Sequence, residues 1–351
     1  MKKKKITTIF LGLIVIVILG LIFILKPNNK SNGSLTVSTF GMSTKQMQSD
    51  VLNPFSKKTG IQVKTQFGDS TNRLTQIEHN SHNGDDVIEL SQNNALTANK
   101  KGLLKKINFN KITDFNNLSA SQQKLAKETN SIPYTVNSVG IIYNPKKVKI
   151  NDWNDLWSSK LRNKIAIPDI TTTFGPAMLY IASDHENKSI TQDDGQAAFK
   201  GIADLKPNVV KTYAQSSDLA NMFKTGEIDA AVVGDYAVGM VKKSDPNVKY
   251  LVPKSGTYAN YDTVSILKNS KNVNNSYKYI NYRLNNSVQK RVASVNSLNN
   301  APVNQNVKLS KADAKDKTYG AVAKRAKMVD FNFVNQHLAK WISEWNKLMN
   351  K

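Results

Sequence analysis

The stretch SIPYTVNSVGIIYNP, residues 131–145, divides the sequence into two runs of alternating strand and helix patterns. The first run predicts a strand, a helix, a strand, a second helix and a third strand from its apolar periodicity. These elements cover residues 35–40, 46–58, 61–67, 69–83 and 86–90. Because this order is typical of a largely parallel sheet covered by helices, the first run predicts one α/β lobe.

The second run starts directly after this stretch and predicts a second α/β lobe. Its expected elements are a helix, a strand, two helices and a strand, at 153–160, 164–168, 177–183, 217–224 and 228–234. The strand YDTVSIL, residues 261–267, is expected to return to the first lobe. We therefore assign residues 35–138 with about 261–307 to lobe 1, and 139–260 with about 308–351 to lobe 2. A C-terminal helix is expected to bury a stripe made of Leu338, Trp341, Ile342, Trp345 and Leu348.

Polar loops follow the predicted strands in both lobes. Since parallel strands present their ligand-facing loops at their carboxyl ends, these loops are expected to meet at one crevice. Lobe 1 supplies Thr39, Phe40, Gly41, Met42, Ser91, Gln92 and Asn93. Lobe 2 supplies Asp235 and Tyr236, although Asp235 either faces the crevice or caps the following helix.

A turn with three successive threonines joins a strand to a helix in AIPDITTTFGPAML, residues 166–179. Hydroxyl groups and free backbone N–H groups before a helix suit a carboxylate, phosphonate or phosphate. Thr171, Thr172, Thr173 and the amide of Gly175 are therefore candidate ligands of an anionic group. The alternative is an ordinary helix cap in which the threonines satisfy nearby amides.

The N-terminus is expected to hold the protein in a membrane. An apolar run from Ile6 to Leu25 follows Lys2 to Lys5, so residues 1–26 predict a membrane anchor or a signal segment. The lack of small residues at a cleavage site favours the uncleaved anchor. The excess of lysine before the run keeps the N-terminus in the cytoplasm and the body outside. Residues 27–34, PNNKSNGS, predict a flexible tether. The chain has no cysteine, which excludes disulfides and lipid attachment to cysteine.

The body beyond the anchor is basic. The first thirty residues hold 6 of the 49 basic residues and no acid, so 43 basic and 26 acidic residues leave a net charge of +17. The sequence shows no arginine-rich helix or aromatic RNA-binding motif, so no nucleic-acid partner is expected. A lysine-rich solvated surface that tolerates an anionic cell wall or membrane is the preferred interpretation.

The sequence resembles the extracytoplasmic solute-binding proteins of ABC importers, nearest the spermidine/putrescine-binding branch. The similarity rests on NPFSKKTGIQV, GLLKKINFNKITDFNNL, SIPYTVNSVGIIYNP, WNDLWSSKLRNKIAIPD and YDTVSIL, in the family's order. It implies a Venus-flytrap fold of two α/β lobes that closes on a small solute and docks on a permease with its ATPase. No cofactor is implied, and we expect a monomer.

The resemblance also suggests a site that departs from that of polyamine-binding relatives. Those relatives place carboxylates on the loop where Thr172 and Thr173 stand, whereas Asp262 matches an aspartate that contacts the ligand amine. Asn260 replaces an aromatic residue, and Tyr261 is a candidate to substitute for it. Further candidates for the walls of the site are Phe40, Tyr134 and Tyr236.

Two kinds of solute stay open at this point. The first is a polyamine, as the resemblance implies. The second is a zwitterionic or anionic solute, such as an aminophosphonate or an amino acid, with its acidic end on the threonine turn and its amine on Asp262.

Other functions find less support in the sequence. HNSH, residues 79–82, suits solvated polar residues better than a metal site, and no adjacent tyrosine pair suggests ferric iron. The four histidines lie in no hydrolase motif, and the sequence has no G-x-S-x-G, H-E-x-x-H or P-loop, so no enzyme is expected. A membrane-anchored sensor or adhesion protein with the same fold is the main alternative.

Overall fold

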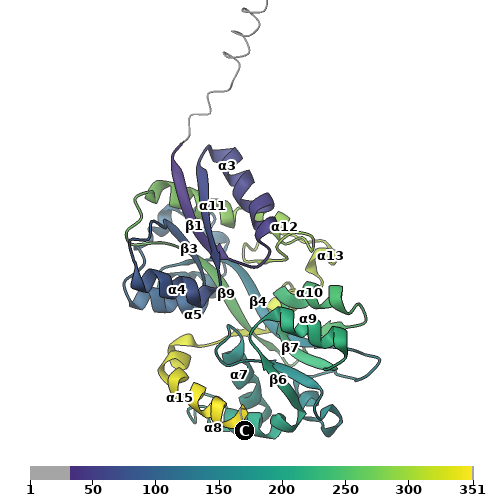
Figure 1. The fold of residues 1–351 in the computed structure, drawn as a ribbon. Helices are drawn as coiled ribbons and strands as arrows, with labels where there is room; N and C mark the ends of the chain where they lie inside the picture. Colours follow the sequence, from purple (N-terminus) through teal and green to yellow (C-terminus); the bar gives the residue numbers. More distant parts are fainter. Residues whose placement is uncertain (1–31, 350–351) are drawn as a thin grey trace, which may run out of the picture.

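The computed structural model describes residues 32–349, which form two α/β lobes joined by strands that run through both (Figure 1). The main strands follow the order β2-β1-β3-β9-β4-β7-β5-β6. Their bounds are β1 Ser34–Phe40, β2 Gln62–Gly68, β3 Val87–Ser91, β4 Ile132–Tyr143, β5 Ile165–Pro168, β6 Val209–Tyr213, β7 Ala230–Gly234 and β9 Thr257–Ile266. Three short strands pair beside them, namely β8 Lys249–Leu251, β10 Ala301–Pro302 and β11 Ala326–Met328.

Lobe 1 is a sheet with a hydrophobic core on each face. β1 lies parallel to both β2 and β3, as the alternation of strands and helices predicts. One core contains Phe55 and Ile280, and the other contains Ile77 and Ala95. The helices of this lobe are α2 Thr44–Met47, α3 Asn53–Thr59, α4 Ser70–His79, α5 Gln92–Lys100, α6 Ala120–Thr129, α11 Val273–Leu284 and α12 Asn286–Val292.

Lobe 2 repeats this arrangement with β5, β6 and β7, which pair in parallel. Its larger core includes Trp341 and Trp345, whose side chains are 0% and 1% exposed, while the other three residues of the predicted stripe are partly buried against that core. The helices of this lobe are α7 Gly175–His185, α8 Gln196–Leu205, α9 Ser216–Thr225, α10 Val238–Ser244 and α15 Phe331–Met349. α13 Lys311–Ala314 and α14 Ala321–Arg325 lie on the segment that leads from β10 to β11.

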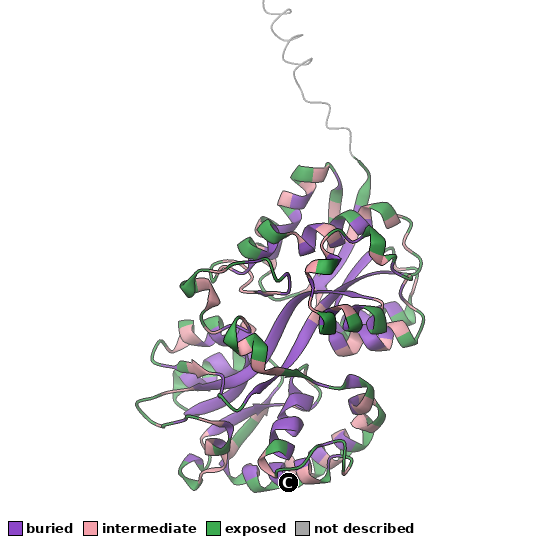
Figure 2. Cartoon of the chain, turned by 180° about the vertical axis from the view of Figure 1, so that it is seen from behind, coloured by how far each residue is buried: buried purple, intermediate pink, exposed green. Residues whose placement is uncertain are grey.

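The strands β4 and β9 cross between the lobes, and Figure 2 shows both as buried. Residues 132–138 of β4 pair with β9, whereas residues 139–143 pair with β7 of lobe 2. β9 pairs with β3 of lobe 1 at its end and with β11 at its start. The boundary expected between residues 138 and 139 falls where β4 changes its partner.

Two predicted elements differ from the structure. The helix expected at 46–58 consists of α2, a π-helical turn at Gln48–Leu52 and α3, which ends at Gly60 in the left-handed region with φ 73°. The helix expected at 153–160 is instead two 3-10 turns, Trp153–Trp157 and Ser159–Leu161. The indole N–H groups of Trp153 and Trp157 donate to the carbonyls of Gly256 and Gly201, so tertiary contacts hold this segment outside a regular helix.

The N-terminal predictions fall largely outside the described residues. The anchor expected at 1–26 lies entirely outside them, and within residues 32–349 no helix is long and apolar enough to cross a membrane. The tether was expected to extend through Ser34, but the structure attaches the chain earlier. Asn32 donates its backbone N–H to the carbonyl of Gly60, and β1 already begins at Ser34.

Candidate functional site

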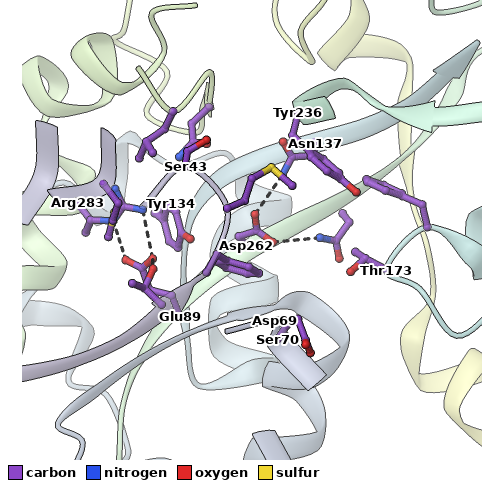
Figure 3. A pocket seen from close by; sticks show the side chains of 18 residues that line it. Ser43, Asp69, Ser70, Glu89, Tyr134, Asn137, Thr173, Tyr236, Asp262 and Arg283 are labelled. Atoms are coloured by element: carbon purple, nitrogen blue, oxygen red, sulfur yellow. Dashed lines mark hydrogen bonds and ion pairs between the residues drawn. The ribbon is translucent and has the colours of Figure 1, made fainter. Parts of the chain in front are cut away.

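A cavity of about 210 Å³ lies beside the crossing strands, between the two lobes (Figure 3). Its lining comes from both lobes and from β4 and β9. The lining residues are Thr39, Phe40, Met42, Ser43, Met47, Asp69, Ser70, Glu89, Tyr134, Asn137, Thr173, Phe174, Tyr236, Asn260, Asp262, Arg283, Leu298 and Asn300. A second hollow of about 680 Å³ is lined by lobe 2 residues alone, including Asp184 and Lys327, and so does not bridge the lobes.

The structure brings eight of the predicted ligand residues together around the cavity. They are Thr39, Phe40, Met42, Tyr134, Thr173, Tyr236, Asn260 and Asp262. These residues come from the ends of β1 and β4, from the turns after β5 and β7, and from β9. These strand ends therefore lie together at the cavity, and each lobe contributes one of its walls.

Asp262 stands in the middle of the cavity wall on β9, as Figure 3 shows. The side-chain amides of Asn137 and Asn260 donate to its two carboxylate oxygens at 3.2 Å and 3.5 Å. Within residues 32–349 no lysine, arginine or histidine forms an ion pair with it. Burial raises the pKa of Asp262 to about 7, and the nearby Glu89 carboxylate adds to this effect, while Arg73 opposes it. A cationic solute would supply the missing counter-charge.

Glu89 is the second carboxylate of the cavity wall, but its charge is already paired. Its side chain is 1% exposed, and its Oε1 lies 2.8 Å from Nε of Arg283, which is 2% exposed. Thr39 Oγ1 and the Tyr279 hydroxyl donate to the same carboxylate at 2.7 Å and 2.9 Å. Burial is the largest effect and lowers the pKa of Arg283, but Glu89 together with Tyr279 and Tyr134 outweighs it, so the pKa of Arg283 is raised.

Two aromatic rings of the lobe 1 wall stack on arginines. The guanidinium carbon of Arg283 lies 4.0 Å from the ring centroid of Tyr134, and that of Arg73 lies 4.7 Å from the centroid of Phe40. Arg73 is 1% exposed and donates to the carbonyls of Ser38 and Glu89. The charged groups behind this wall therefore form one fixed network.

The lobe 2 wall carries no charged side chain. It consists of Thr173, Phe174 and Tyr236, and the last two rings stack with their centroids 6.0 Å apart and their planes 17° apart. Gly234 lies behind them, because a Cβ at this position would come within 2.6 Å of both rings. Only glycine leaves room for this stacked pair.

The threonine turn is bonded within itself and does not place Thr171, Thr172 or Gly175 on the cavity wall. Thr171 Oγ1 donates to Oδ1 of Asp169 at 2.6 Å, and Thr172 Oγ1 donates to the carbonyl of Asp169 at 2.7 Å. Thr172 Oγ1 also accepts the N–H of Gly175 at 3.1 Å. The hydroxyl donors and the amide predicted to hold an anion are thus used as in a helix cap, and their ligand role stays a prediction.

The remaining predicted residues also lie away from the cavity lining. Gly41 bonds to the carbonyl of Gly68, and Ser91 bonds to Ser70. Tyr261 is packed in the lobe 1 core, on the face of β9 opposite Asp262, because successive strand residues point to opposite faces. The other three are Gln92 and Asn93, which belong to α5, and Asp235.

Asp235 faces the segment that returns from lobe 1 rather than the cavity. It is 2% exposed, and its Oδ2 accepts from the backbone N–H and the hydroxyl of Thr318 at 2.7 Å and 2.6 Å. Burial raises the pKa of Asp235 to about 6, against these hydrogen bonds. These hydrogen bonds hold the residue that follows β7 against the segment that returns from lobe 1.

Sequence reasoning missed ten lining residues. Glu89 lies inside a strand that was predicted as buried, and an acid in a buried strand was the signal that could have identified it. Asn137 gives a similar signal, because it is a polar residue within the stretch 131–145. Arg283 reaches the cavity from α11, which no local pattern links to β3. The others are Ser43, Met47, Asp69, Ser70, Phe174, Leu298 and Asn300.

The described part of the chain holds no group of three or more His, Asp or Glu side chains that could bind a metal ion. The residues 79–82 lie at the end of α4 and the turn after it, where His82 bonds to its neighbours Asn80 and Ser81. The structure thus provides no metal centre among residues 32–349.

Comparison with known proteins decides the family. The family described as bacterial extracellular solute-binding protein matches residues 50–321. The chain belongs to this family. A solved ABC transporter structure from Clostridium perfringens shares 42% sequence identity and a TM-score of 0.81, over 90% of this chain and 99% of that one.

Relatives of the family carry names that state their ligands. The spermidine/putrescine-binding periplasmic protein 1 of Haemophilus influenzae is 27% identical over 69% of this chain and 68% of its own length. The putrescine-binding periplasmic protein PotF of Escherichia coli is 25% identical over 67% and 70%. The substrate-binding protein PotD of Streptococcus pneumoniae has the same fold, with a TM-score of 0.76 at 20% identity, over 91% of this chain and all of that one.

These similarities establish the role of the chain. It is the substrate-binding component of an ABC transporter, a member of a family that binds a small solute outside the cytoplasm and delivers it to a permease. Its relatives are transport proteins rather than enzymes, and the sensor or adhesion alternative is not favoured.

Proposed function

We propose that the transported solute carries an ammonium group and that Asp262 holds this group in the cavity between the lobes. The single observation that supports the proposal is the half-buried carboxylate of Asp262, which faces the cavity and has no cationic partner in the described residues. A buried charge without a partner is unfavourable, so a cation that enters gains a strong interaction. Names of relatives that bind putrescine or spermidine agree with an amine ligand.

Closure of the two lobes follows from the position of the site. The amine would contact Asp262 on a crossing strand, and the rings of Phe174 and Tyr236 would cover it from lobe 2. Contacts made by both lobes exist only in the closed form, so binding shifts the hinge equilibrium toward closure. We place the boundaries of the moving lobes at residues 138/139 and about 260/261, with a third connection near 307/308.

The mode of attachment is also part of this proposal. Lys2 to Lys5 and the apolar run from Ile6 to Leu25 support an N-terminal anchor that keeps the body outside the cytoplasm. We propose that the anchored protein acts as a monomer beside its permease. Mass measurement of the detergent-purified chain would test both statements, since cleavage or dimerisation changes the mass.

The ammonium site is tested with Asp262→Asn in the full-length chain. A thermal-shift screen with putrescine, 4-aminobutan-1-ol, amino acids and aminophosphonates first identifies a stabilising amine. Such a ligand at one hundred times its Kd stabilises by about 2.7 kcal/mol. Asp262→Asn is expected to weaken that amine at least 30-fold, because removing one partner of a buried charge pair costs about 2 to 5 kcal/mol.

Asp69→Asn is the matched control, because Asp69 also lines the cavity but is exposed at its rim. It is expected to change the affinity less than threefold.

The empty Asp262→Asn protein is also expected to be more stable than wild type at pH 8, by roughly 1 to 4 kcal/mol. Because the pKa of Asp262 in the folded wild type is raised to about 7, the free energy of unfolding of the wild type falls as the pH rises from about 4 to 7. An unchanged affinity in Asp262→Asn would reject the proposal.

A further inference from the structure

Several relatives bind polyamines, which carry two or more ammonium groups, but the charges around this cavity are arranged differently. The lining contains three carboxylates, namely Asp69, Glu89 and Asp262. Two guanidinium groups, those of Arg73 and Arg283, stand directly behind the aromatic rings of the same wall. Glu89 and Arg283 form an ion pair, whereas Asp262 forms none within residues 32–349, so one ammonium group finds an unpaired carboxylate here.

The other two carboxylates of the lining, Glu89 and Asp69, are less available to a cation than Asp262. Glu89 is held by Arg283, Thr39 and Tyr279, so an ammonium group would have to displace a buried ion pair to use it. Asp69 is exposed and already accepts from the backbone and side chain of Asn72 at the start of α4. Exposed pairs of this kind contribute little to affinity. Asp262, which is half-buried, therefore remains the one carboxylate of this lining able to receive a cation.

The lobe 2 wall does not supply a second carboxylate. Its lining residues Thr173, Phe174 and Tyr236 are uncharged. Asp169, the acid next to this wall, accepts from the N–H and the hydroxyl of Thr171 at 3.0 Å and 2.6 Å. A second ammonium group of a bound solute would thus face aromatic rings and two arginines.

Asn260 selects the type of ammonium group. Its Nδ2 donates toward Asp262, while its Oδ1 is buried and accepts no hydrogen bond from any described residue. Asn260 is 2% exposed and lines the cavity next to Asp262. A primary ammonium has three N–H donors and can serve both the carboxylate and this amide oxygen, whereas a quaternary ammonium leaves the amide oxygen unpaired.

Resting on the proposed function, in which Asp262 holds the solute amine, we infer that the solute carries one primary ammonium group and is not a polyamine. The aromatic rings around the cavity then contact its uncharged part. Asn260 beside Asp262 thereby favours a compact monoamine over an extended polycation.

The experiment compares small amines that differ in the number and type of their charged groups, on the full-length chain, by isothermal titration calorimetry. 4-Aminobutan-1-ol and N-acetylputrescine carry one ammonium group, putrescine carries two, and choline carries a quaternary group. Both single primary amines are expected to bind at least tenfold more tightly than putrescine and choline. Asn260→Ala is expected to weaken 4-aminobutan-1-ol about tenfold and to change choline less than twofold, which removes the preference for a primary ammonium.

The outcomes separate this inference from the proposed function. If putrescine binds more tightly than the single amines and Asp69→Asn removes this preference, the inference that the solute carries one ammonium group is wrong. The proposed ammonium site at Asp262 is then unaffected. If choline binds as tightly as 4-aminobutan-1-ol, the inference that the solute carries a primary ammonium group is wrong. If no amine binds, or if Asp262→Asn binds as the wild type does, the proposed function fails and the inference fails with it.

Discussion

The two walls of the cavity between the lobes differ in charge and in what holds them in place. The lobe 1 wall is charged and fixed, because Glu89, Arg283, Thr39 and Tyr279 form one buried network beside Asp262. The lobe 2 wall is uncharged and consists of a stacked ring pair next to a threonine turn. Under the proposed function, lobe 1 would select the solute by charge, while lobe 2 would cover the bound solute by apolar contact.

A wall that selects charge needs its own charges paired before the solute arrives. Charged groups that are already hydrogen-bonded do not move when a ligand enters, so discrimination costs little reorganisation. A covering wall needs only shape and apolar area, since its contacts form on closure. The variants below therefore have different expected effects on the two sides of the cavity.

Arg283→Met is expected to have the largest effect on stability. It leaves Glu89 buried without its cationic partner, which should lower the free energy of unfolding by about 3 to 5 kcal/mol. Urea denaturation measures this loss. Arg291→Met is the control, because the exposed Arg291 side chain bonds, among the residues that the structure describes, to Asp50 O and the Tyr282 hydroxyl. It should cost about 1 kcal/mol.

The folded Arg283→Met protein should also gain affinity for putrescine relative to 4-aminobutan-1-ol, because Glu89 becomes available to a second ammonium group. An unchanged stability would show that the charged wall does not depend on this ion pair.

The pH dependence of amine binding is expected to be the next largest effect. The pKa of Asp262 in the empty cavity is about 7, and the amine binds the ionised form. Affinity should therefore rise about tenfold per pH unit up to pH 7, or about 2.7 kcal/mol between pH 5 and pH 7, and then level off. Calorimetric titrations at these values measure it. Asp262→Asn should show no such slope, and a slope that persists in this variant would assign the effect to another group.

Gly234→Ala is expected to break the lobe 2 wall. The added methyl group would overlap the rings of Phe174 and Tyr236, so the stacked pair has to move at a cost of about 1 to 3 kcal/mol. Amine affinity should fall about tenfold, as measured by calorimetry. Gly239→Ala in α10 is the matched control, because a Cβ there meets no atom within 4 Å and should stabilise the helix slightly. Equal behaviour of the two variants would contradict a covering role for the rings.

Thr172→Val should have the smallest effect. It removes the hydroxyl that accepts the Gly175 N–H, which should cost about 1 kcal/mol of stability and leave amine affinity within twofold. Thermal unfolding and calorimetry measure the two quantities. Thr173→Val, at a residue that lines the cavity, should instead change the affinity for the amine and leave the thermal unfolding unchanged. A tenfold loss of affinity in Thr172→Val would favour the anionic contact predicted for this turn.

Local pattern was sufficient to predict much of the architecture. Apolar alternation, buried apolar runs and strand composition located β1, β2, β3, β5 and β7 to within one or two residues, because these patterns depend on neighbours in the chain. The segment 153–160 was predicted as a helix and is not one, since its two tryptophans bond to carbonyls of Gly256 and Gly201. Contacts at such sequence distances leave no trace in local periodicity.

The same limit applied to the site. Asp262 and the neighbouring Asn260 could be identified from one short stretch, and both line the cavity. Tyr261 was included with them, but strand alternation turns it into the lobe 1 core. The threonine turn looked like a set of free donors, and only the coordinates show that Asp169 and Gly175 already use its hydroxyl groups.

The sequence by itself determined two α/β runs, the stretch that joins them, and a carboxylate at residue 262. Such features follow from short-range periodicity and residue type. The tertiary structure decided which charges remain available to a solute. Glu89 and Arg283 are 194 residues apart in the chain, yet their pairing is what leaves Asp262 alone. Electrostatic interaction depends on distance and burial in space, and the fold alone sets both.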